Sequence, residues 1–308
     1  MSGIQVRKVP AFHGWQWVRE GFRLFARAPL PLLLLALVLK TLLDLFPLLG
    51  TAGLVITKLL IPVLIVGFMS VMRQLAPDPL MPSPAGRPPV GPDLSGVRPA
   101  PRLSLDAFIS WARQGKALQT VLLLGVISLG FDLLVSYLSN LPAELERLAA
   151  SINKAGQMPH DQQAMAELFG PVLQSLFLSV LISLPFYLFL WYAPVFAGLH
   201  GLPLMKSIVF SCVAVSRNLL AFLCHGLSLF GLTIVLAILI QLLGAVLGAG
   251  GDFGLQSMLI FLLQPLVICV LGCAYWACYL DTVEVTAQQR ESLPASGDEG
   301  TDDSDHAV

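Results

Sequence analysis

Four charged side chains lie inside apolar runs of this sequence, and they are its clearest candidates for chemistry. Lys40 and Asp44 fall in one run, Lys58 in the next, and Asp132 in a third. A charge at the centre of a membrane span costs about 3 kcal/mol on insertion scales, so such residues are expected to pair. Two lysines and two aspartates would form a neutral cluster. This cluster could couple a proton or a solute to movement, or it could fix the packing of spans one to three.

Helix geometry predicts which of these charges meet. Lys40 precedes Asp44 by four residues and therefore lies one turn away on the same helix face. A short turn near residue 51 joins the first two runs and lies midway between Asp44 and Lys58. We therefore expect Lys58 to face Asp44 across the hairpin, about 22 Å from the start of the first run. Asp132 is expected at a similar depth in the third run.

The cysteines do not form a metal-binding pattern. They are Cys212, Cys224, Cys269, Cys273 and Cys278. Cys269 and Cys273 share a helix face, but Cys278 is rotated away from them and the sequence has no CxxC pair. We expect no metal, no cofactor and no disulfide framework, and we expect His225 to make an interhelical hydrogen bond.

Signatures of enzymes are absent from the sequence. It contains no HExxH, no GxSxG and no glycine-rich phosphate loop that ends in GK[ST]. We therefore expect a protein that is not an enzyme.

The elements that contain these residues read as membrane spans. Of the 308 residues, 56% are hydrophobic and 12% are charged, whereas about 25% are charged in soluble proteins. Runs of about 20 apolar residues are long enough to cross a bilayer. They predict six spans, at about 30–49, 52–72, 118–140, 171–197, 219–247 and 255–280. The expected fold class is an all-α integral membrane protein with a six-span domain over residues 30–280.

The distribution of basic residues predicts the orientation. Of the 18 Lys and Arg residues, 14 fall in the two terminal segments and in the loops after the second and fourth spans. Only Arg147 and Lys154 fall on the opposite side. Because cytoplasmic loops carry an excess of Lys and Arg, both termini are predicted to be cytoplasmic.

Four segments lie outside the predicted spans. Residues 1–29 form a cytoplasmic N-terminal segment, residues 77–102 a Pro-rich cytoplasmic linker, residues 141–170 an outer loop, and residues 281–308 an acidic tail. The linker cannot be helical and cannot bury a core, so we expect it to be extended or disordered. The tail has too few apolar residues to fold, so we expect it to be disordered.

An amphipathic helix is predicted directly before the first span. Its aromatic side consists of Trp15, Val18, Phe22 and Phe25. Its basic side contains Arg19, Arg23 and Arg27. This pattern is typical of a helix that lies in the membrane interface, with its rings among acyl chains and its guanidinium groups among lipid phosphates. The predicted partners are therefore membrane lipids, specifically anionic lipids, and not nucleic acid.

Two features predict a threefold repeat. Similar segments precede the third span, over residues 104–117 with Trp111 and Arg113, and the fifth span, over residues 204–218. The returning helix of each hairpin contains one central proline, which removes a backbone hydrogen bond and kinks the helix. These prolines are Pro62, Pro185 and Pro265. We expect three units, each an interfacial helix followed by a two-span hairpin.

The N-terminal sequence resembles a known group of proteins. The residues concerned are Arg7-Lys8-Val9-Pro10-Ala11, Gly14-Trp-Gln-Trp and Gly21-Phe-Arg-Leu-Phe, ending at Pro29. They resemble the start of a family of proteobacterial multi-pass inner-membrane proteins that has no assigned activity. The resemblance implies the bacterial inner membrane as location and supplies no catalytic residues.

Together these features favour a non-enzymatic inner-membrane protein that binds lipid or organises partner proteins. A second copy of the same chain, in a homo-oligomer, is another possible partner. The alternative is a small-solute transporter or permease that uses the intramembrane charges.

Overall fold

The computed structural model describes residues 4–75, 105–155, 161–246 and 253–285. The predicted Pro-rich linker at 77–102, most of the turn between the last two spans, and the tail from residue 286 lie outside the described residues.

Within the described residues, six helices are long and apolar enough to cross a membrane. They are α2 (Pro29–Leu45), α3 (Thr51–Leu75), α5 (Gly115–Ser139), α7 (Gln162–Phe189), α10 (Leu219–Val246) and α11 (Phe253–Thr282). The short 3-10 helix η1 (Phe46–Leu49) extends α2 into the first hairpin turn. The chain is thus an all-α integral membrane protein with six spans, as its composition predicts.

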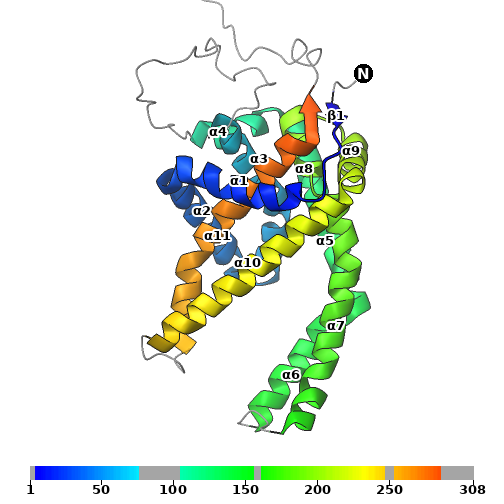
Figure 1. The fold of residues 1–308 in the computed structure, drawn as a ribbon. Coiled ribbons are helices and arrows are strands. Elements are labelled where there is room, and N and C mark those ends of the chain that lie inside the picture. Colours follow the sequence, from blue (N-terminus) through cyan, green and yellow to red (C-terminus); the bar gives the residue numbers. More distant parts are fainter. Residues whose placement is uncertain (1–3, 76–104, 156–160, 247–252, 286–308) are drawn as a thin grey trace, which may run out of the picture.

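Shorter elements gather at one end of the spans and form a cap (Figure 1). The cap contains α1 (His13–Arg27), α4 (Leu105–Ser110), η2 (Trp111–Arg113), α8 (Ala193–His200) and α9 (Leu204–Arg217). Strand β1 (Ile4–Val6) pairs antiparallel with β2 (Val283–Val285). The prediction of a disordered tail from residue 281 is therefore wrong for residues 281–285, because the start of the chain covers them.

The aromatic core of the protein lies where the cap meets the spans. Trp17, Tyr192 and Phe196 pack there with Trp276 and Tyr279 from the end of α11, and all five are nearly or fully buried. The Tyr192 hydroxyl lies 2.7 Å from the Cys278 thiol and 2.9 Å from the Thr282 hydroxyl. Polar tips in this core thus find partners within it, as buried polar groups require.

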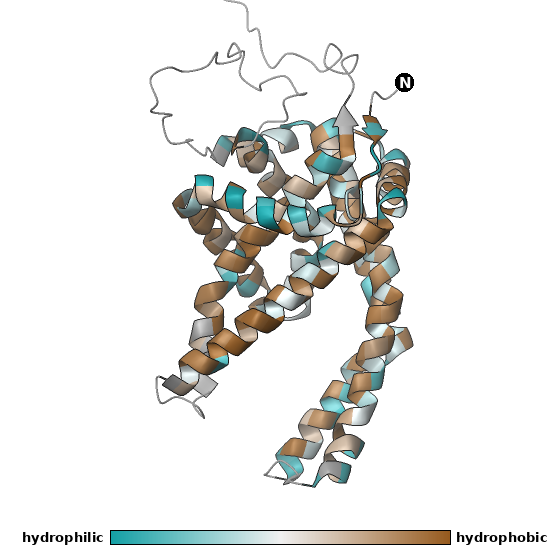
Figure 2. Cartoon of the chain, viewed as in Figure 1, coloured by the Kyte–Doolittle hydropathy of each residue, from teal (hydrophilic) through white to brown (hydrophobic). Residues whose placement is uncertain are grey.

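The spans diverge at the end away from the cap. Helices α10 and α11 converge toward the end away from the cap, whereas α6 (Leu141–Ala155) and α7 form a separate hairpin (Figure 1). The outward faces of α7 and α10 are apolar (Figure 2), and Leu227 of α10 is 72% exposed. Such faces are suited to contact with acyl chains. The outer loop predicted at 141–170 is mostly helical, because α6 and the first turns of α7 extend the hairpin.

The fourth predicted span, 171–197, lies within a longer apolar segment, Gln163–His200, which consists of two helices. Helix α7 begins at Gln162 and ends at Phe189, and the separate helix α8 begins at Ala193. Pro194 occupies the first turn of α8, where its missing N–H costs nothing. The prolines Pro62, Pro185 and Pro265 lie inside α3, α7 and α11, and the kinks predicted for them stay a prediction.

A helix precedes each hairpin in the chain, but these helices pack differently. Helix α1 packs on α10 and α11, α4 packs on α3, and α9 packs on α8 and α7. The arrangement as three similar units therefore stays a prediction.

Candidate functional site

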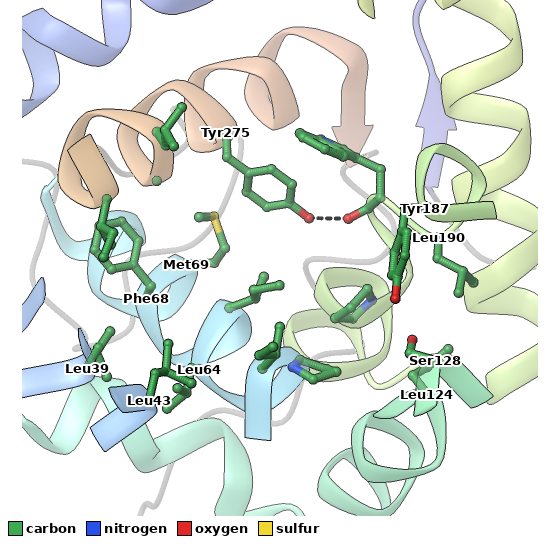
Figure 3. Close-up of a pocket in the computed structure, with 18 of the residues that line it drawn as sticks. Leu39, Leu43, Leu64, Phe68, Met69, Leu124, Ser128, Tyr187, Leu190 and Tyr275 are labelled. Carbon is green, nitrogen blue, oxygen red and sulfur yellow. Dashed lines mark hydrogen bonds between the residues drawn. The ribbon is translucent and has the colours of Figure 1, made fainter. Parts of the chain in front are cut away.

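A cavity of about 620 Å³ lies among the spans (Figure 3). Residues of α2, α3, α5, α7, α8, α10 and α11 line it. Most of its wall is apolar and includes Leu39, Leu43, Leu64, Phe68, Leu124 and Leu229. Cavities of this size with few polar groups are typical of sites for small or amphiphilic ligands.

Lys58 lines this cavity and connects three spans. Its Nζ lies 2.5 Å from Oδ2 of Asp132 in α5, and Asp132 also accepts a hydrogen bond from the Tyr187 hydroxyl of α7. The Lys58–Asp132 ion pair thus neutralises two of the predicted intramembrane charges, while Tyr187 satisfies a further lone pair of the carboxylate.

Lys40 forms the second intramembrane pair. It is 5% exposed, binds Asp44 one turn along α2, and lies 4.3 Å from the centre of the Phe261 ring of α11. A cation over an aromatic face is stabilised by the ring quadrupole. Lys40 also lines the cavity.

The predicted pairing of Lys58 with Asp44 is therefore wrong, although all four charges are paired. Helix α5 approaches α3 closely at Gly125, which has no side chain. A methyl group there would lie only 3.1 Å from the backbone of Leu59. This approach brings Asp132, two turns farther along α5, within reach of Lys58. Asp44 is already bound by Lys40 on its own helix.

Sequence reasoning missed several polar groups of the cavity wall. The Tyr275 hydroxyl donates to the carbonyl oxygen of Trp191, and both residues line the cavity (Figure 3). The buried indole N–H of Trp191 has no hydrogen-bond partner within the described residues. Aromatic residues with polar tips inside spans are the sequence signal that could have identified these groups.

Each thiol of α11 has a partner within the spans or the core. Cys269 lies 3.1 Å from the carbonyl oxygen of Leu32, Cys273 lies 3.8 Å from the sulfur of Met72, and Cys278 contacts Tyr192. His225 of α10 lies 3.2 Å from the carbonyl oxygen of Gly14, so it makes an interhelical hydrogen bond.

Helix α1 has three sectors and not the two predicted. Its buried residues are Gly14, Trp17, Val18, Gly21 and Leu24. A methyl group on Gly14 would lie 2.2 Å from the Ala221 carbonyl oxygen, and one on Gly21 would lie 2.8 Å from Ala274. These glycines let α1 pack directly on α10 and α11, which buries Val18 and partly buries Phe25.

The remaining sectors of α1 face outward. Trp15 and Phe22 are 45% and 44% exposed, so they remain available for the membrane interface. Arg23 binds Glu20 at 3.1 Å, whereas Arg19 and Arg27 line a second cavity against the end of α11.

Trp111 and Arg113, also predicted to lie at the membrane interface, have different environments in the structure. Trp111 is 6% exposed and packs with Val66, Val121 and Ala193, so its assignment to the membrane interface is wrong. Its indole N–H donates to the Phe108 carbonyl oxygen at 2.9 Å. Arg113 is exposed and binds Asp106 at 2.5 Å.

Comparison with known proteins agrees with the membrane fold. The chain is 26% identical over 306 residues to a probable inner membrane protein of Burkholderia thailandensis, covering 96% of this chain and 100% of that protein. No model of a known protein family matches the chain, and no solved structure matches it. The relative and the six apolar helices confirm the resemblance to multi-pass inner-membrane proteins, and they show this chain to be a multi-pass membrane protein.

Proposed function

We propose that this protein is a non-enzymatic protein of the bacterial inner membrane that binds lipid in the cavity among its spans. The observation that carries the proposal is the wall of that cavity, which is apolar over most of its area and comes from all six spans. An acyl chain is matched to such a wall, because it loses no hydrogen bonds there and gains contacts with packed side chains.

Two lysines line the otherwise mostly apolar wall. Lys40 and Lys58 add positive charge, although Asp44 and Asp132 already balance it. The cavity therefore favours an amphiphile over a ligand with a strong net charge.

A small-solute transporter is the second candidate, and the two lysines at the cavity support it. A water-soluble substrate needs a polar, hydrated route to the depth of Asp44 and Asp132. Ser128 of α5 lines the cavity and provides a probe of water. With Cys212 and Cys224 changed to serine, Ser128→Cys should react with a water-soluble maleimide in membranes only if the route is hydrated.

A matched pair on α10 tests the lipid proposal. Leu229 lines the cavity, whereas Leu227 is 72% exposed and does not line it. Leu229→Trp should fill part of the cavity and displace lipid, and Leu227→Trp should not. Native mass spectrometry of each protein after mild detergent extraction measures the retained lipid. Equal retention by the two variants would contradict the proposal.

We further infer that both termini are cytoplasmic, as the basic residues predict. Binding of partner proteins would then fall to cytoplasmic segments such as 77–102 and 286–308, which lie outside the described residues. The outward apolar faces of α7 and α10 could equally accept acyl chains or a second copy of this chain.

A further inference from the structure

A second cavity, of about 450 Å³, lies between α1 and the end of α11. Its α1 wall includes Gln16, Trp17, Arg19 and Arg27, and its α11 wall includes Ala277, Leu280 and Asp281. This cavity is more polar than the one among the spans and lies at the cap end of the molecule. It therefore differs from the acyl-chain site in both position and chemistry.

The carboxylates at this cavity already have partners. Asp281 accepts a hydrogen bond at 2.8 Å from the indole N–H of Trp17, and its carboxylate lies 2.7 Å from Nδ1 of His13. Glu20 binds Arg23, which does not line the cavity.

Arg19 and Arg27 differ from Arg23, which is paired with the carboxylate of Glu20. No carboxylate partner of Arg19 or Arg27 occurs among the residues that the structure describes. Asp281 binds Trp17 and His13, and Glu20 binds Arg23, so the guanidinium groups of Arg19 and Arg27 keep donors available to a ligand in the cavity. Guanidinium groups bind phosphate oxygens in a bidentate manner, with charge-assisted hydrogen bonds.

The position of α1 places these donors at headgroup level. Arg27 ends α1, and the span α2 begins two residues later at Pro29. Trp15 and Phe22, exposed on a neighbouring side of α1, are suited to the boundary between headgroups and acyl chains. A phosphate group of a lipid in the adjoining leaflet would therefore meet Arg19 and Arg27 without leaving its normal depth.

We propose that Arg19 and Arg27 bind the phosphate group of an anionic lipid headgroup in the cavity between α1 and α11. Gln16 lines the same cavity and provides a neutral donor. The site depends on the membrane placement of the chain and not on occupancy of the cavity among the spans.

Binding of short-chain phosphatidylglycerol to the purified full-length protein tests this site. Arg19→Gln with Arg27→Gln should weaken binding at least about tenfold, since it removes charge-assisted contacts to the phosphate. Lys116→Gln with Lys206→Gln is the matched control, because it removes two exposed positive charges that do not line the cavity. The control should stay within about twofold of the wild type. Equal weakening by both double variants, or unchanged binding by the first, would overturn the proposal.

Further probes separate the sources of phosphate. Phosphatidylcholine of equal chain length should bind more weakly, and equal binding would overturn the preference for an anionic headgroup. Inorganic phosphate alone should bind poorly to the wild type. If inorganic phosphate binds in an arginine-dependent manner and phosphatidylglycerol does not, the lipid headgroup is the wrong ligand.

Two checks distinguish loss of the headgroup site from unfolding and from loss of lipid in the cavity among the spans. Arg19 and Arg27 are both exposed, so their replacement should leave the Tm without lipid unchanged. Leu229→Trp should reduce lipid retention in the cavity among the spans without affecting the headgroup site, so the two lipid proposals can fail separately.

Discussion

At the scale of single residues, the pairing of Lys58 with Asp132 yields a stability prediction. Asp132→Asn should lower the stability by roughly 3 kcal/mol, because it leaves the Lys58 charge without a counter-ion inside a span. Adding Lys58→Met should restore most of this loss. Thermal unfolding of the purified variants in one detergent measures both effects.

Asp44 provides the control for this double-mutant cycle. Lys58→Met with Asp44→Asn should show additive losses, because Asp44 binds Lys40 and not Lys58. Coupling of Lys58 to Asp44, with none to Asp132, would restore the pairing predicted from the hairpin turn and contradict the structure.

The sequence is informative about which residues are charged within the spans but not about which of them meet. Spacing along one helix correctly predicts Lys40 with Asp44, since helix geometry fixes both positions. The partner of Lys58 depends on how closely α5 approaches α3, which Gly125 decides through packing. Trp111 shows the same limit of local pattern, because its burial depends on Val66 and Ala193 from distant elements.

At the scale of elements, docking of α1 depends on close backbone approach. Gly14→Ala should destabilise the protein by about 1–3 kcal/mol, because the added methyl group would meet the Ala221 carbonyl oxygen at 2.2 Å. Gly226→Ala on α10 is the control, since nothing lies within 4 Å of a methyl group there. This control should be neutral or slightly stabilising, given the higher helix propensity of alanine. A Gly14→Ala Tm equal to that of Gly226→Ala would show that α1 is not docked on α10.

The long spans were predictable because apolar runs of such length have few alternatives, whereas the role of α1 was not. Its aromatic and basic sides are typical of an interfacial helix, yet Trp17 and Val18 are buried. Gly14 and Gly21, seven residues apart on one side, are the sequence signal for this packing, and Pro194 is the signal for the break after α7. Both signals concern contacts, which hydropathy alone does not describe.

At the scale of the whole molecule, the pairing of β1 with β2 joins the two ends of the described chain. Ile4 pairs with Val285 and Val6 pairs with Val283, and an Arg217 guanidinium N–H donates to the Val6 carbonyl oxygen at 3.2 Å. Asn218 adds two contacts, accepting from the Val9 N–H at 2.8 Å and donating to the Arg7 carbonyl oxygen at 2.9 Å. Both ends therefore lie on one side of the membrane, in agreement with an even number of spans.

The distribution of Lys and Arg predicts that both ends lie on the cytoplasmic side, and reporter fusions can test this orientation. Green fluorescent protein fused before Met1 or after Val308 should fluoresce, and alkaline phosphatase at the same positions should be inactive, because Lys and Arg favour the cytoplasmic side. Alkaline phosphatase fused after Ala155, at the end of α6, should be active and serves as the control. The strand pairing requires the two ends to agree whichever side they occupy. Disagreement between the ends would contradict the fold, whereas agreement on the outer side would contradict only the orientation inferred from charge.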